Sequence, residues 1–255
     1  MTARFFLVIA SRADTAAIGL AAAAAPELRL MTPADLSQPG WTLRLGDIAP
    51  ATAVIGGEVV AASAIAGVLV RLPGVAAHDL PHIAASDRGY VAAEMTAFLL
   101  AFLTALNCPL VNRPTPQCLA GPAWRQERWV SVANRLSIPV RPALRRQAVL
   151  AMPAAVGAPV SAATTTITIV GRRHIGEADA VLVKRSHALA DAAGAGLLAV
   201  QFDGSGADAR LVGTSLWADL GDRAIAGAVL QLLRDKAAPV TSRRRDDIAV
   251  GHCAG

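Results

Sequence analysis

The sequence predicts an α/β protein in which a mainly parallel sheet flanked by helices is followed by a smaller α+β region. Strand-like apolar runs alternate with helical segments through the first 140 residues, as is typical of a parallel sheet covered by helices. The chain then becomes rich in Ala, Pro and Gly, until the β-branched run Thr164–Val170 begins a second region. The predicted divisions are residues 1–140, residues 141–238 and a flexible tail at 239–255.

The first elements follow one another closely. Arg4–Ser11 is an apolar strand, and the alanine-rich stretch after it, which ends at Pro26, favours a helix. Leu28–Met31 is a second strand. The adjacent glycines Gly56 and Gly57 supply the positive φ of a tight turn, so we expect a hairpin around them. The next strand is Gly67–Arg71.

Two helices complete the predicted first region. From Tyr90 to Leu106 the apolar residues recur at helical spacing on a broad face, which predicts a helix packed in the core. A short strand is expected at Pro109–Asn112, and a second helix at Ala123–Leu136, which ends before Pro139.

The second region begins with the clearest strand of the chain. β-branched residues fill Thr164–Val170. A helix is expected at Val181–Ala193, strands at Leu197–Phe202 and Arg210–Gly213, and a last helix at Asp222–Leu233.

Composition excludes several classes. Of the 255 residues 54% are hydrophobic and 17% are charged, and the mean hydropathy is +0.45, so disorder is not expected. The apolar run Met95–Leu106 is shorter than the roughly 20 residues that cross a bilayer, and no signal sequence is apparent. We therefore expect a cytoplasmic protein without a membrane span.

Charge and cysteine content argue against nucleic-acid and metal binding. The net charge is +5, and all but two of the 24 basic residues are arginines, the exceptions being Lys184 and Lys236. The densest basic run, Arg243–Arg245, is followed by two aspartates and lacks stacking aromatics, so a solvated tail is expected. The three cysteines lack the paired spacing of a zinc site.

Several segments, taken in order, carry a family resemblance. In the first region they are Val70–Pro73, the helix with Glu94, Leu110–Pro114 with its Asn112, and Trp124–Val140; in the second they are Thr166–Arg173 and Leu197–Leu211 with its Asp203. Together they resemble the glutathione synthetase and RimK-like branch of the ATP-grasp superfamily. The resemblance covers about residues 60 to 235. It implies a pre-ATP-grasp domain followed by an ATP-grasp region.

The resemblance also implies phosphate-binding cations. ATP-grasp ligases form an acyl phosphate from a carboxylate and ATP, and in the family lysines of the central subdomain bind the phosphates. No lysine precedes Lys184 here, and Arg125 stands at about the position of a helix lysine. Arginine is a planar fork and not an equivalent point charge. We expect that the set of phosphate-binding cations is absent.

The implied magnesium site is incomplete too. The family holds the metal with an Asp and a later Glu-x-Asn. Asp203 matches the Asp, but about ten residues later the chain has Gly213–Trp217, which contains no carboxylate. Hard cations prefer carboxylate ligands, so Asp203 is expected to be a turn residue. About 115 residues follow Val140, fewer than a complete ATP-grasp region needs, which indicates a truncated, degenerate member.

Three functions remain open. The first is a non-catalytic subunit or binding partner that uses no cofactor and contacts an active biosynthetic ligase or another copy of itself. The second is a divergent carboxylate–amine ligase that uses ATP and Mg, with Arg125, Arg172 and Arg173 binding the phosphates. The third is a sensor of a small acidic metabolite, with a cleft around Arg71, Glu94 and Asn112.

Two local clusters have alternative interpretations. Trp124, Arg125, Arg128 and Trp129 are either core packing with exposed arginines or a cation–π surface for a partner. His78, Asp79 and His82 lie around Pro81, which makes a regular helix unfavourable, so they form either a loop without catalytic function or a ligand site.

Overall fold

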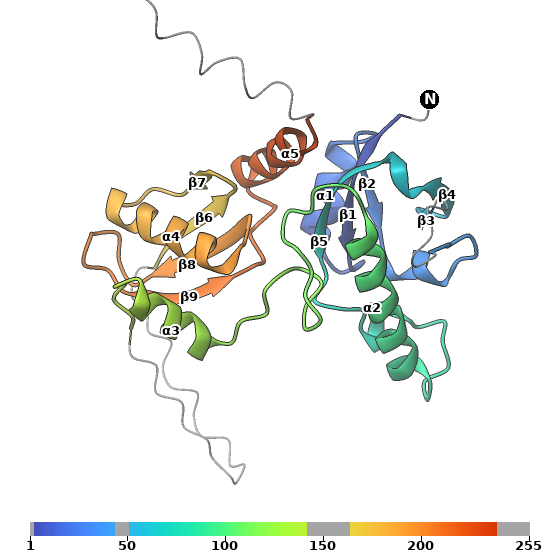
Figure 1. Ribbon diagram of the computed structural model, residues 1–255, viewed down its shortest axis with the longest axis horizontal. Coiled ribbons are helices and arrows are strands. Elements are labelled where there is room, and N and C mark those ends of the chain that lie inside the picture. Colours follow the sequence, from blue (N-terminus) through green and yellow to red (C-terminus); the bar gives the residue numbers. More distant parts are fainter. Residues whose placement is uncertain (1–2, 44–50, 142–163, 239–255) are drawn as a thin grey trace, which may run out of the picture.

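The computed structural model describes residues 3–43, 51–141 and 164–238. It confirms the predicted α/β architecture, with a three-stranded parallel sheet in the first region and a four-stranded antiparallel sheet in the second (Figure 1). The Pro- and Ala-rich stretch 142–163 and the predicted tail 239–255 lie outside the described residues. Among the helices of the described ranges, none is long and apolar enough to cross a membrane.

The parallel sheet is centred on β1 (Phe5–Ala10), which lies between β2 (Leu28–Met31) and β5 (Ile65–Arg71). All six residues of β1 are buried, because its alternating side chains enter a different apolar cluster on each face of the sheet. This two-sided burial explains the continuous hydrophobic run in the sequence.

Helix α1 (Thr15–Ala23) covers one face of this sheet. The opposite face is covered by α2 (Arg88–Ala105) and by the hairpin of β3 (Thr52–Ile55) and β4 (Glu58–Ala61). The hairpin turns at Gly56 and Gly57, whose φ values are 59° and 80°, as predicted. The described part of this half also contains three short 3-10 helices: η1 (Pro33–Ser37), η2 (Ala62–Ala64) and η3 (Ala77–Asp79).

The second sheet has the order β7-β6-β8-β9. Its strands are β6 (Thr165–Val170), β7 (Arg173–Ile175), β8 (Leu197–Phe202) and β9 (Leu211–Ser215). Helices α3 (Gln126–Arg135) and α4 (Ala180–Ala193) pack against one of its faces. The strand predicted at Pro109–Asn112 was wrong: this segment makes only the isolated bridge between Leu110 and Val68.

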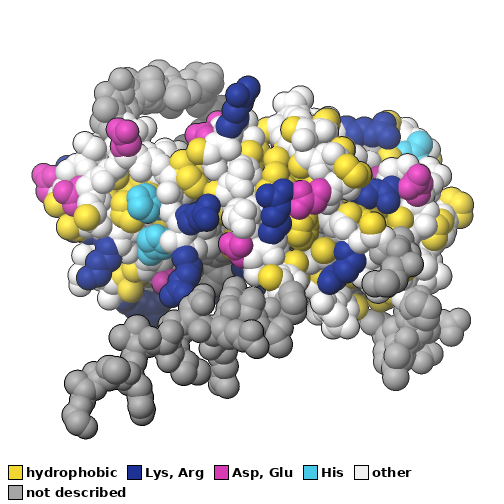
Figure 2. Space-filling view, turned by 90° about the horizontal axis from the view of Figure 1, so that it is seen from above, with side chains coloured by type: hydrophobic (Ala, Val, Ile, Leu, Met, Phe, Trp, Pro, Cys, Tyr) yellow, Lys and Arg dark blue, Asp and Glu magenta, His cyan; other side chains and the backbone are white. Residues whose placement is uncertain are grey.

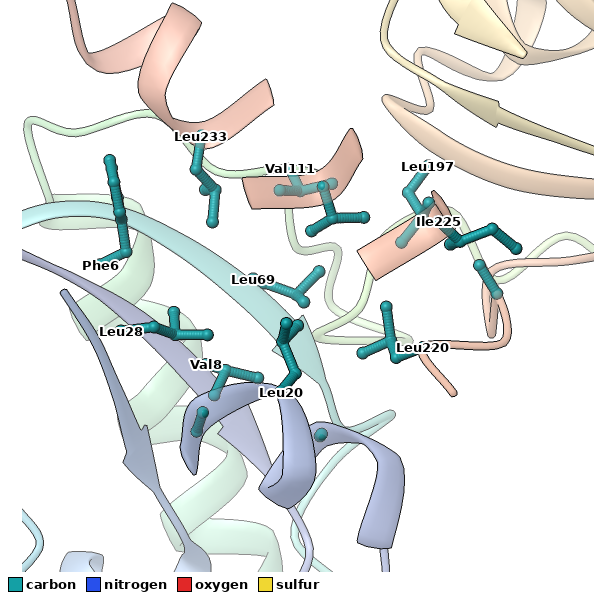
Figure 3. Packing of buried hydrophobic residues seen from close by; sticks show 14 of the residues in the cluster. Phe6, Val8, Leu20, Leu28, Leu69, Val111, Leu197, Leu220, Ile225 and Leu233 are labelled. Atoms are coloured by element: carbon teal, nitrogen blue, oxygen red, sulfur yellow. The ribbon is translucent and has the colours of Figure 1, made fainter. Parts of the chain in front are cut away.

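Helix α5 (Arg223–Ala237) joins the two sheets through a shared apolar cluster. Figure 3 shows Leu233 of α5 on the side of Phe6 and Leu69 of the parallel sheet, and Ile225 of α5 beside Leu197 of the second sheet. Burying a Val or Leu side chain contributes roughly 1.5–3 kcal/mol. The contact between the sheets is therefore a substantial part of the core.

A buried polar contact lies beside this apolar cluster. The side chain of Asn112 donates to the carbonyl oxygen of Leu197 at 3.1 Å and accepts from the amide of Leu197 at 3.0 Å. The neighbouring Gly196 lies so close to the first region that an added Cβ would be 2.4 Å from the carbonyl oxygen of Val111. A side chain at residue 196 would force the two segments apart.

We expect Gly196→Ala to lower the free energy of unfolding by about 1–3 kcal/mol, the usual cost of overpacking, because the new methyl group meets backbone atoms that cannot move aside. Urea denaturation followed by circular dichroism measures the change. Gly227→Ala in α5 is the matched control, since among the described residues an added Cβ there would meet nothing within 4 Å beyond its own helix, and alanine favours the helix. Equal stability of both variants would contradict the close contact.

Candidate functional site

Arg71 ends β5 and is used to hold the two regions together. Its Nε donates to Oδ2 of Asp14 at 2.9 Å, and its Nη1 donates to the carbonyl oxygen of Ala218, before α5, at 2.8 Å. The other carboxylate oxygen of Asp14 accepts from the amide of Ala17 and caps α1. The side chains of Arg71 and Asp14 are 8% and 16% exposed, so this guanidinium is not available to a ligand.

The cleft expected around Arg71, Glu94 and Asn112 is not formed by these three residues. Arg71 and Asn112 are both buried in contacts between the two regions. Glu94 lies exposed on α2, which covers the opposite face of the parallel sheet from α1 and α5. The three side chains therefore do not converge on one ligand.

Asp203 closes a turn after β8. Its Oδ1 accepts from the amide of Arg210 at 2.7 Å, its Oδ2 lies 3.3 Å from Nε of Arg210, and its own amide donates to the carbonyl oxygen of Arg210 at 3.0 Å. In the described parts of the chain, no group of three or more His, Cys, Asp or Glu side chains could hold a metal ion. The surroundings of Asp203 do not fit the magnesium site that the resemblance implies.

The three arginines considered for phosphate binding lie at opposite edges of the second sheet. Arg172 is in the turn between β6 and β7, and Arg173 begins β7, the strand at one edge. Arg125 precedes α3, and the next residue, Gln126, donates to the carbonyl oxygen of Val212 in β9, the strand at the other edge. One phosphate chain cannot contact Arg125 and Arg172 together in this arrangement.

The two lysines are also apart. Lys184 is exposed on α4. Lys236 lies in the last turn of α5, where desolvation and the neighbouring Arg113 lower its pKa. Figure 2 shows that on the face seen from above the basic side chains are spread out with acidic ones among them.

We define the tryptophan–arginine surface as the cluster of Trp124, Arg125, Arg128 and Trp129. Trp129 is 7% exposed and packs in the core of the second region. Trp124 is half-buried, with its ring centroid 4.7 Å from that of Trp129, and Cζ of Arg128 lies 4.2 Å from the centroid of the Trp124 ring. Both sequence interpretations thus apply in part: one tryptophan is core, and the other supports an exposed arginine.

The fold has close counterparts among solved structures. A RiPP-associated ATP-grasp ligase of Chryseobacterium gregarium, in complex with ADP and a leader and core peptide, aligns with a TM-score of 0.64 over 92% of this chain and 98% of that chain, at 13% identity. The macrocyclase MdnC of Microcystis aeruginosa MRC, bound with its precursor peptide MdnA, aligns with a TM-score of 0.61 over 91% and 100%, at 11% identity. The ATP-grasp ligase PsnB gives 0.57 over 93% and 100%, at 12% identity.

The chain has an ATP-grasp-like fold. At these identities the similarity extends to the fold alone. No protein-family model and no curated protein matches the sequence.

The partners of these residues were only weakly indicated by the sequence. An Asp directly before a helical stretch is a common N-cap, so capping by Asp14 was predictable, but its pairing with Arg71, 57 residues away, was not. Likewise the Asp203-Gly-Ser-Gly stretch indicated a turn, while the closing contact with Arg210 depends on the strand register.

We expect Arg71→Met to destabilise the protein strongly, by roughly 3–5 kcal/mol, because it leaves the half-buried carboxylate of Asp14 without its cation. Thermal or urea denaturation measures the effect. Arg234→Gln is the control: its ion pair with Glu27 is 46% and 41% exposed and should contribute less than about 1 kcal/mol. An Arg71→Met variant as stable as the control would show that the buried pair is dispensable.

Proposed function

We propose that this chain is a non-catalytic, ATP-grasp-like protein that binds a peptide or protein partner of a biosynthetic ligase. The observation that carries the proposal is the closure of Asp203 by Arg210 in a region whose next strand offers no carboxylate. A magnesium ion would have to displace this arginine and would find hydroxyl groups in place of a second carboxylate.

The positions of the basic residues support the same proposal over a divergent ligase. Phosphoryl transfer requires several cations directed at one phosphate chain. Arg125 and Arg172 lie at opposite edges of the second sheet, and residues 142–163 contain arginines but no lysine. Binding of a partner by the surfaces of the protein would explain why an ATP-grasp-like fold is present without these cations.

A peptide is the partner class that the comparisons favour. Several ligases of similar fold were solved with a leader, core or precursor peptide bound. The tryptophan–arginine surface suits a peptide with acidic and apolar residues, because Arg125 and Arg128 are exposed while Trp124 supplies apolar area.

Isothermal titration of the full chain with ATP and MgCl₂ tests the loss of nucleotide binding. We expect no heat of binding in the low-micromolar range, because the described residues supply no joined set of phosphate cations and metal carboxylates. Low-micromolar binding of ATP that requires magnesium would refute the non-catalytic assignment.

Fluorescence anisotropy of a dye-labelled peptide of alternating Glu and Leu tests the binding surface. We expect Arg128→Gln to weaken binding about tenfold, as loss of one charged contact costs about 1.5 kcal/mol. Arg135→Gln, in the last turn of the same helix, is the matched control and should bind as the unchanged protein does. Equal affinities of the two variants would exclude this surface.

A further inference from the structure

We propose that a cavity at the carboxyl end of the parallel sheet binds a small carboxylate. The cavity has a volume of about 420 Å³. It is bounded by residues 11–13 after β1, by Pro33 and Ala34 after β2, and by residues in the segment 78–82, which follows β5. The cavity is thus lined by the segments that follow each of the three strands.

This position is the one that parallel sheets offer to ligands. In open sheets, ligands bind outside the carboxyl ends of the strands where the strand order reverses. In the order β2-β1-β5 the chain passes to one side of β1 and then returns to its other side. The strand order therefore reverses at β1, and the cavity lies at this end of the sheet, beside the segments that follow the three strands.

The walls of the cavity are fixed by a buried carboxylate. The side chain of Asp79 is 7% exposed; its Oδ1 accepts from Oγ of Ser11 at 2.7 Å, and its Oδ2 accepts from the amide of Ala76 at 3.1 Å. These bonds tie the segment after β5 to the loop after β1. Among the described residues that line the cavity only Asp79 is acidic, and both of its carboxylate oxygens already accept hydrogen bonds from the protein.

The groups left to face a ligand are able to donate hydrogen bonds. Arg12 lines the cavity and makes no ion pair within the described residues. The exposed His78 and His82 also line the cavity. Nε2 of His78 lies 3.9 Å from Oδ1 of Asp79, and Nε2 of His82 lies 2.7 Å from Oγ of Ser37. One permanent cation and two imidazole rings around a single internally bonded carboxylate favour an anion.

The shape of the site favours a carboxylate over a phosphate. A guanidinium matches the two oxygens of a planar carboxylate with parallel N–H donors. Phosphate sites instead use successive backbone amides, often of glycines. Here Pro33 and Pro81, which have no N–H, form part of the wall, and among the described residues no glycine lines it. The site is separate from the tryptophan–arginine surface and does not depend on the proposed partner.

Isothermal titration with succinate tests the proposal. We expect saturable one-to-one binding that Arg12→Gln weakens by about tenfold or more, the effect of removing one charged hydrogen-bond donor. His78→Asn provides a second, exposed variant and should weaken binding as well. Arg172→Gln, in the turn of the second sheet, is the matched control and should leave the affinity unchanged.

Several results would overturn the site. They are no saturable succinate binding, affinity unchanged in both Arg12→Gln and His78→Asn, and binding of inorganic phosphate but not succinate. Neutral succinamide should not bind, and equal binding of succinamide and succinate would also contradict recognition of the acid groups.

Discussion

The packing of α5 between the two sheets is the constraint on which the rest of the structure depends. Neither sheet buries its apolar surface alone, because the cluster around Leu233 and Ile225 contains side chains of both. Arg71 and Asn112 reinforce this contact with directional hydrogen bonds, so it has a defined geometry as well as an apolar area. Arg71 and Asn112, which we considered as substrate-binding residues, here form contacts that hold the two regions together.

Sequence periodicity predicted the elements that local patterns define. β8 has the predicted bounds, and β6 differs by one residue, because apolar and β-branched runs mark buried strands. It failed where tertiary pairing decides. The three-residue β7 has an exposed Arg-His start with no strand signal, and the Pro109–Asn112 segment has strand-like residues but only a bridge to pair with.

The candidate site was harder to predict than the fold for a physical reason. The sequence identified Arg71, Asn112 and Asp203 as polar residues at family positions, but it could not show which partner each would take. Their partners are Asp14 with the carbonyl of Ala218, the backbone of Leu197, and Arg210. The partners of Arg71 and Asn112 include backbone groups of the second region, so these contacts form only when the two regions pack together. A shared fold therefore does not by itself imply a shared function, because packing and catalysis depend on different residues.

The position of α5 in the chain also bears on how the protein is made. The face of β1 that carries Phe6 and Val8 is synthesised long before α5, yet part of its cover comes only with residues 223–237. On a ribosome the parallel sheet therefore emerges with an uncovered apolar surface and keeps it until nearly the whole described chain has left the exit tunnel. Such surface is prone to aggregate or to recruit a chaperone, and cotranslational folding of the first region by itself would be incomplete.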